Sequence, residues 1–175
     1  AAEGFMRGTR GERMALAMGT SGPGATNLIT PIASCWFDSI PCLFITGQVN
    51  TNEQKGERPL RQQGFQELDI VQAIRSITKY SVKVEHPSAL LPVLHEACSV
   101  ALSGRRGPVL IDIPNDIQRS DIPDEVVEDW VKRPLESIPS PGVPELQLAQ
   151  LQALCRESRR PLVCFGGGAK TASNF

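Results

Sequence analysis

The sequence predicts an α/β protein built on a parallel sheet flanked by helices. Short apolar runs recur along the chain, helix-periodic segments separate them, and glycine or proline marks most junctions. Strands that alternate with helices at this spacing form βαβ units, whose strands run parallel. The expected strands are residues 13–20, 41–48, 78–84 and 108–113. The expected helices between them are residues 24–37, 65–74 and 87–103, each with apolar residues at helical spacing.

The two ends of the chain predict more than one domain. Residues 1–8 have the pattern of the last turns of a helix ending at Gly8 or Gly11, so the first domain, 1–122, is expected to lack its N-terminal part. An acidic, proline-rich stretch at 123–144 predicts a linker. A helix at 145–158 and a strand at 161–165 then predict the start of a second α/β domain, 145–175, which is truncated in this chain.

The composition of the chain argues against a nucleic-acid-binding protein, a membrane protein and a metal-binding protein. The 18 basic residues are balanced by 19 acidic ones, giving a net charge of -1, which argues against a nucleic-acid partner. No apolar run is long enough to cross a bilayer, so no membrane partner is expected. The five cysteines form no Cys-x-x-Cys pair, which suits a reducing, cytoplasmic location. His86 and His95 lack partners at telling spacings, so we expect no metal site in this chain.

A glycine turn, Thr20-Ser21-Gly22-Pro23-Gly24-Ala25-Thr26-Asn27, follows the first expected strand and opens a helix. Two glycines around a proline permit a sharp turn, and the free N–H groups of the next helix suit an anionic or polar group. Asn27 is placed to cap that helix or to present an amide. A purely structural βα turn explains the pattern about equally well. Gly166, Gly167 and Gly168 also follow an expected strand, in a manner compatible with a diphosphate.

A polar stretch at 49–64 lacks any periodicity and predicts a long surface loop. Ordered loops of this length are often functional. Arg58 and Arg61 within it are candidates for binding an anionic substrate, although solvated loop charges are an equally good interpretation.

Seven blocks in order carry a family resemblance: AAEGFMRGTRG, TSGPGATN, DSIPCLFITGQV, GFQELDI, ITKY, SGRRGPVLIDIPNDIQ and RPLVCFGGG. Together they resemble the thiamine-diphosphate-dependent enzymes of the acetolactate synthase family, over essentially the whole chain. The resemblance implies that residues 1–122 are most of a pyrimidine-binding domain. It also implies that the tail begins a central domain, which in acetolactate synthases holds FAD.

The resemblance implies specific site residues. Gly22, Pro23, Gly24 and Asn27 match the turn that lines the thiamine-diphosphate cleft at the subunit interface, and Gln48 matches the glutamine leading into the active-site loop. Phe65 and Gln66 match the catalytic pair facing the substrate side of the thiazolium ring. Arg105 and Gly166–Gly168 match positions that approach the FAD diphosphate in members that bind it.

Departures from the family pattern define what this chain lacks. The family's catalytic glutamate belongs in a His-Glu-Gln segment upstream of Ala1, and the Mg²⁺ motif belongs to a separate domain; neither is in this sequence. Asn115 stands where acetolactate synthases usually have lysine. The chain alone is therefore expected to be inactive.

The resulting hypothesis concerns the full-length protein. It decarboxylates a 2-oxo acid with thiamine diphosphate and transfers the acyl carbanion, in partnership with a second copy of itself. Two alternatives remain open: a thiamine-diphosphate-dependent decarboxylase or lyase acting on another 2-oxo acid, and a non-catalytic, truncated binding or dimerisation module.

Overall fold

The computed structural model describes residues 1–9, 14–136 and 142–166, and it divides into two units, 1–138 and 139–175. The first unit is centred on a four-stranded sheet. Its strands are β1 (Ala15–Gly19), β2 (Cys42–Gln48), β3 (Tyr80–Lys83) and β4 (Val109–Pro114). They lie in the order β1-β2-β4-β3, and every pairing is parallel. The predicted α/β fold with a parallel sheet is thereby confirmed.

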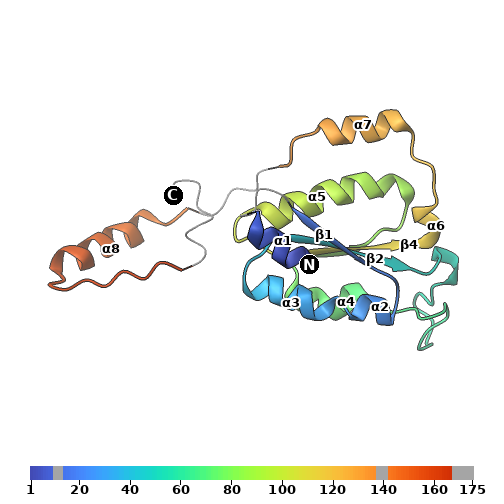
Figure 1. Ribbon diagram of the computed structural model, residues 1–175, viewed down its shortest axis with the longest axis horizontal. Helices are drawn as coiled ribbons and strands as arrows, with labels where there is room; N and C mark the ends of the chain where they lie inside the picture. Colours follow the sequence, from blue (N-terminus) through green and yellow to red (C-terminus); the bar gives the residue numbers. More distant parts are fainter. Residues whose placement is uncertain (10–13, 137–141, 167–175) are drawn as a thin grey trace. The chain divides into compact units, whose positions relative to one another are not determined.

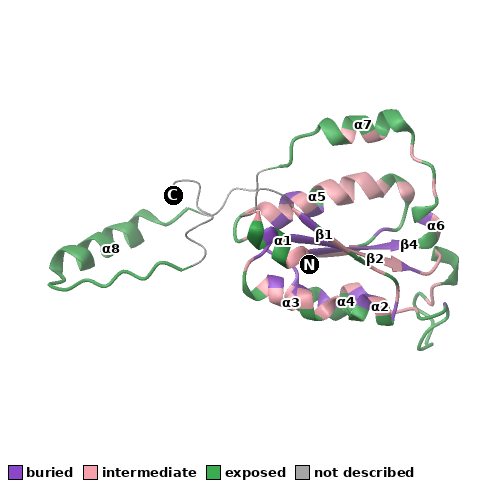
Figure 2. Cartoon of the chain, in the orientation of Figure 1, coloured by how far each residue is buried: buried purple, intermediate pink, exposed green. Residues whose placement is uncertain are grey.

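Helices cover both faces of the sheet (Figure 1). The helices α1 (Ala2–Gly8), α3 (Ile29–Phe37) and α4 (Ile70–Ile74) pack on one face, where their apolar residues form a core with Phe44 and Leu110. Helix α5 (Leu90–Leu102) packs on the other face with Leu43, Val109 and Ile111. Strands β2 and β4 are covered on both faces, so almost every residue in them is buried (Figure 2). Their continuous apolar runs are the pattern expected for that position.

Strand β1 is less well covered than the other strands. Its residues Leu16 and Met18 are 50% and 72% exposed, while Ala15 points into the core. Alternate residues of a strand face opposite sides of the sheet. The face of β1 opposite the α1 and α3 core is therefore open in the described part of the chain.

The predicted helix at 24–37 is two helices, α2 (Pro23–Thr26) and α3. Pro31 explains the break, because it has no N–H to donate to the carbonyl of Asn27 and its ring crowds that turn. The chain bends at Asn27 and Leu28, and Pro31 then lies in the first turn of α3, where proline is tolerated.

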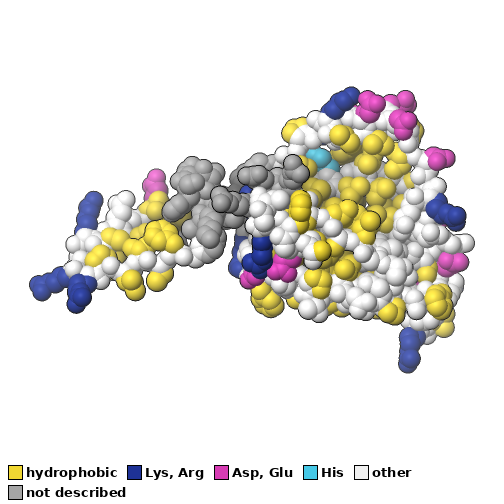
Figure 3. All heavy atoms as spheres, viewed as in Figure 1, with side chains coloured by type: hydrophobic (Ala, Val, Ile, Leu, Met, Phe, Trp, Pro, Cys, Tyr) yellow, Lys and Arg dark blue, Asp and Glu magenta, His cyan; other side chains and the backbone are white. Residues whose placement is uncertain are grey.

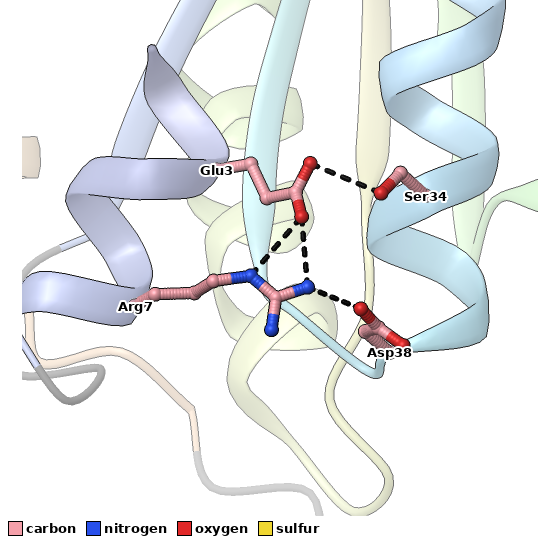
Figure 4. Close-up of polar contacts among 4 residues, drawn as sticks. All are labelled: Glu3, Arg7, Ser34 and Asp38. Atoms are coloured by element: carbon pink, nitrogen blue, oxygen red, sulfur yellow. Dashed lines mark hydrogen bonds and ion pairs between the residues drawn. The ribbon is translucent and has the colours of Figure 1, made fainter.

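A polar network fastens α1 to α3 (Figure 4). The Arg7 guanidinium donates to Glu3, one turn earlier in α1, and also to Asp38 at the end of α3. Ser34 Oγ donates to the other Glu3 oxygen at 3.0 Å. Hydrogen bonds from Arg7 and Ser34 lower the pKa of Glu3. The stabilisation from Glu3 is thus present above its ordinary pKa and is lost as pH falls through the lowered value.

Part of the predicted linker at 123–144 is helical. Residues Asp124–Lys132 form helix α7, with Asp124 and Glu125 in its first turn, where acidic groups favour the helix dipole. The helix packs on α5: the ring of His95 meets Trp130 edge-on at 5.6 Å, and His95 Nε2 bonds the Pro134 carbonyl at 2.9 Å. The first unit therefore includes helix α7 and extends past residue 122.

The second unit contains helix α8 (Glu145–Glu157), which agrees with the helix predicted at 145–158. The strand predicted at 161–165 is not present, because these residues are described without regular structure. A strand needs a neighbour to pair with, and the described residues of this unit supply none. The leucines of α8 are exposed: Leu146, Leu148, Leu151 and Leu154 (Figure 3).

Candidate functional site

The candidate site lies where the parallel strands end. The glycine turn follows β1, Gln48 ends β2, and Pro114 ends β4 before the short helix α6 (Asn115–Gln118). Because the strands run parallel, these segments share one edge of the sheet (Figure 1). Ligands of open α/β sheets bind in the crevice outside this carboxyl edge.

The glycine turn has a backbone that only glycine adopts freely. Gly22 is the N-cap of α2 with φ 55° and ψ -121°, Pro23 is in the first turn of that helix, and the Gly24 N–H bonds the Ser21 carbonyl at 3.2 Å. Asn27 does not cap the start of a helix: it is exposed at the C-terminal end of α2. The turn therefore presents Asn27 and Pro23 to solvent and keeps Gly22 buried.

The segment 64–69 forms a compact turn, although the sequence predicted a helix from residue 65. Helix α4 begins only at Ile70, capped by the Asp69 side chain, which accepts from the Gln72 N–H at 2.9 Å. The Glu67 carboxylate accepts the N–H groups of Lys55 and Gln63, both at 2.8 Å, and that of Gly64 at 3.3 Å. Burial acts to raise the pKa of Glu67, but these backbone hydrogen bonds outweigh it and the pKa is lowered.

The glycine turn and the Phe65–Gln66 pair are brought together. A Cβ on Gly22 would lie 2.6 Å from the Gln66 carbonyl oxygen and 2.8 Å from the Gln66 Cβ. Gln66 itself has φ 56°, a left-handed conformation that costs a side-chain-bearing residue energy. Phe65 is 80% exposed beside it. Strained backbone of this kind concentrates at functional sites, where the surrounding structure maintains it.

Gln48 is buried and connects three segments. Its Nε2 donates to the Leu68 carbonyl at 2.8 Å and to Asp112 Oδ2 at 3.0 Å, while its Oε1 accepts from the Val49 N–H at 3.0 Å. Asp112 is 1% exposed and also accepts from Thr46 Oγ1 at 2.7 Å. Burial raises the pKa of Asp112 to about 6, against the opposing hydrogen bonds from Thr46 and Gln48. Asp112 is not among the site residues predicted from the sequence, where it stands as a single acidic residue inside the apolar run PVLIDI.

A pocket of about 590 Å³ opens beside this cluster. Its lining has both charge signs and includes Gln48, Arg61, Glu67, Lys83 and Asp112. Of the two loop arginines considered as anion binders, only Arg61 is in this lining. Arg58 is turned back onto its own loop, donating to the carbonyls of Lys55 and Gln54 at 2.9 and 2.8 Å.

Asn115 supplies no positive charge at the position where the resemblance implies a lysine. Its Nδ2 donates to Asn50 Oδ1 at 2.9 Å, so the end of β4 is tied to the start of the 49–64 loop by neutral amides. Next to it, the Asp116 carboxylate accepts from the N–H and the hydroxyl of Thr51. These contacts fix the loop entrance without supplying an anion-binding group.

Of the residues matched to an FAD site, Arg105 lies away from the glycine turn. Arg105 follows α5 and precedes β4, which places it at the amino edge of the sheet, where its Nε donates to Ser39 Oγ at 2.8 Å. Gly166 is in the second unit, and Gly167 and Gly168 lie outside the described residues. Within the described ranges, no three His, Cys, Asp or Glu side chains are grouped to hold a metal ion. None of the described helices has the length and apolar character to span a membrane.

Comparisons with known proteins agree with this geometry. Residues 1–73 match the family model described as thiamine pyrophosphate enzyme, N-terminal TPP binding domain. An acetolactate synthase of Arthrospira platensis is 40% identical over 169 residues, covering 97% of this chain and 28% of the relative. Acetolactate synthase 2, chloroplastic, of Nicotiana tabacum is 40% identical over 177 residues, covering 99% of this chain and 25% of the relative.

A bacterial relative gives the same result. The acetolactate synthase large subunit of Corynebacterium glutamicum is 38% identical over 160 residues, covering 89% of this chain and 24% of that protein. The chain thus spans about a quarter of the length of the curated relatives it matches. Residues 1–73 are similar to the N-terminal TPP-binding domain of thiamine pyrophosphate enzymes, and nearly the whole chain is similar to acetolactate synthases.

Proposed function

We propose that the full-length protein is a thiamine-diphosphate-dependent enzyme that decarboxylates a 2-oxo acid and transfers the acyl group. This chain contributes the wall of the cofactor site formed by Gly22, Pro23, Gly24, Asn27 and Gln48. The contact between Gly22 and Gln66 is the observation that carries the proposal, because it joins the proposed cofactor turn to the proposed substrate-facing pair.

The residues fit the cofactor in both shape and chemistry. The bound cofactor supplies the electron sink for decarboxylation. The glycine turn presents Pro23 and Asn27 to solvent at the carboxyl edge, and exposed Phe65 offers an apolar ring to the substrate side. Buried Gln48 holds the loop that carries Phe65 and Gln66. We assign the Mg²⁺ that accompanies thiamine diphosphate to another part of the full-length protein, because the resemblance places its motif in a separate domain.

A second copy of the protein completes the proposed site, and a small 2-oxo acid is the proposed substrate. FAD remains a proposal resting on Arg105 and Gly166–Gly168, which an absorbance band of bound flavin would test. Cytoplasmic location stays a prediction. One observation favours the alternative of a simple decarboxylase or lyase: Asn115 is paired with Asn50, so no charge stands where acetolactate synthases carry lysine.

Thiamine diphosphate is expected to bind the full-length protein in the presence of Mg²⁺. Isothermal titration measures it directly, and size-exclusion chromatography with light scattering gives the assembly state of the same sample. We expect saturable binding by a dimer or a larger even assembly. Absence of binding by an intact dimer contradicts the proposed function and leaves the non-catalytic module as the better interpretation.

Phe65→Ala is expected to lower turnover while leaving thiamine-diphosphate affinity close to that of the wild type. The ring is 80% exposed and packs little against the fold, so its loss removes a substrate-facing surface and not a structural contact. The readouts are kcat with pyruvate and larger 2-oxo acids, and the cofactor Kd from titration. Phe37→Ala, at a 73% exposed position on α3, is the matched control and is expected to change neither. The reverse pattern, weaker cofactor binding with normal kcat, would show that the Phe65 loop faces the cofactor.

A further inference from the structure

Asp112 is a buried carboxylate whose partners are neutral. It is 1% exposed and lies between Thr46 of β2 and Lys83 of β3 in the register of the sheet. Its two oxygens accept from Thr46 and Gln48. The Lys83 ammonium is instead directed to Gln54 Oε1, at 2.6 Å. Burying a charge without an ion-pair partner is costly, so this carboxylate needs an explanation beyond packing.

Every hydrogen-bonding group of the Gln48 side-chain amide has a partner, and the orientation of the amide depends on Asp112. One N–H goes to the carboxylate, the other to the Leu68 carbonyl, and the oxygen accepts from Val49. An ionised carboxylate only accepts hydrogen bonds, so the NH₂ group must face it. A flipped amide would place two oxygens against each other and would leave the Leu68 carbonyl without this donor. The charge on Asp112 therefore selects the amide orientation that holds Leu68.

We propose that Asp112 is a positioning residue that acts through Gln48 to hold the 64–69 turn, and with it Phe65 and Gln66, at the carboxyl edge of the sheet. Asp112 connects β4 to β2 through its hydrogen bond with Gln48. Gln48 then connects β2 to the turn through its hydrogen bond with the Leu68 carbonyl. The turn approaches Gly22 through Gln66. The catalytic consequence rests on the proposed function, whereas the structural consequence does not.

Protonation of Asp112 removes the constraint. A protonated carboxyl group can donate, so the Gln48 amide can then turn its oxygen toward Asp112 and release Leu68. Two charged neighbours act on the pKa: Lys83 on β3 lowers it, and Asp69 at the start of α4 raises it. The other charged groups lining the adjacent pocket are Lys55, Arg61 and Glu67.

Activity and stability should respond to this titration in opposite directions. The pKa of Asp112 is raised to about 6 in the fold, so its contribution to stability is present in full below the ordinary value and is lost as pH rises through 6. The positioned turn, in contrast, forms as pH rises through 6. A carboxylate with only a structural role would change stability with pH but would leave the position of the turn, and therefore the activity, unchanged.

The test uses full-length protein: wild type, Asp112→Asn, Thr46→Val and, as matched control, Asp116→Asn. Asp116 is also a carboxylate bonded to a threonine at this edge, but its partner is Thr51. The measurements are kcat with thiamine diphosphate, Mg²⁺ and pyruvate between pH 5 and 8, and hydrogen exchange of residues 64–69 at pH 7.

In the wild type, we expect kcat to fall as the pH drops below about 6, which gives the pH profile an acidic limb. In Thr46→Val this limb should shift to higher pH, and in Asp112→Asn it should be absent. In Asp112→Asn, kcat should fall about 10- to 100-fold, the loss typical of a misplaced catalytic segment, and the turn should exchange faster. Asp116→Asn should keep the acidic limb near pH 6 and the wild-type exchange of residues 64–69. Wild-type kcat and exchange in Asp112→Asn would overturn the proposal. If the wild type shows no cofactor-dependent turnover, the proposed function fails, and the exchange comparison still decides the role of Asp112.

Discussion

Gly22→Ala in the full-length protein is expected to lower the free energy of unfolding by about 2 kcal/mol or more and to abolish most activity. Alanine at φ 55° and ψ -121° lies outside the regions allowed to residues with a Cβ, which costs about 1–3 kcal/mol in backbone strain alone. Its methyl group would also lie 2.6 Å from the Gln66 carbonyl oxygen, a backbone atom that moves only if the whole turn moves. The 64–69 turn must therefore shift, taking Phe65 with it.

Gly56→Ala separates the two causes. Gly56 has φ 57°, but a Cβ there would meet nothing within 4 Å. Backbone strain should lower the free energy of unfolding of this variant by about 1–2 kcal/mol, but no neighbouring residue should be displaced. Denaturant unfolding of both variants measures the loss of stability caused by backbone strain. Their kcat values show whether the 64–69 turn has been displaced. Equal losses of activity in the two variants would show that the Gly22–Gln66 contact has no part in the site.

Phe44→Ala is expected to destabilise the first unit by about 3–5 kcal/mol, the range for removing a buried aromatic ring. Phe44 is 1% exposed at the centre of β2, between Ala17 and Leu110 in the sheet register, and it packs in the core shared with α1, α3 and α4. The cavity would lie between the sheet and these helices.

Phe37→Ala provides the same chemical change on the surface. Phe37 ends α3 and is 73% exposed, so the expected change is within about 0.5 kcal/mol. Thermal and urea unfolding of both variants give the comparison. A loss at Phe37 as large as that at Phe44 would mean that the full-length protein covers the end of α3.

The sheet was predictable because each strand has its own local signal. Strands β2 and β4 are covered on both faces and are therefore continuous apolar runs, which the sequence displays directly. The glycine turn was predictable for the same reason: Gly22, Pro23 and Gly24 specify the backbone locally. Features encoded by a few adjacent residues were recovered from the sequence.

Features that depend on distant residues were not recovered. Residues 65–69 have helical spacing, but the Glu67 carboxylate takes the N–H groups of Lys55, Gln63 and Gly64, which favours a turn. Helix α7 has the composition of a linker, and its order comes from packing on α5. The importance of Asp112 depends on Gln48, which lies 64 positions earlier in the sequence. Contacts between residues far apart in the sequence cannot be predicted from the pattern of neighbouring residues.

The strand order has a consequence for synthesis on the ribosome. Strand β2 pairs with β4, and β3 also depends on β4, yet β4 is made last. At about 5–20 residues per second, the roughly 60 residues between β2 and β4 take about 3–12 s to emerge. Throughout that interval the nascent chain carries an apolar strand, Cys42–Gln48, that lacks its central partner. The vulnerable period for aggregation or chaperone capture should therefore end when Pro114 leaves the exit tunnel.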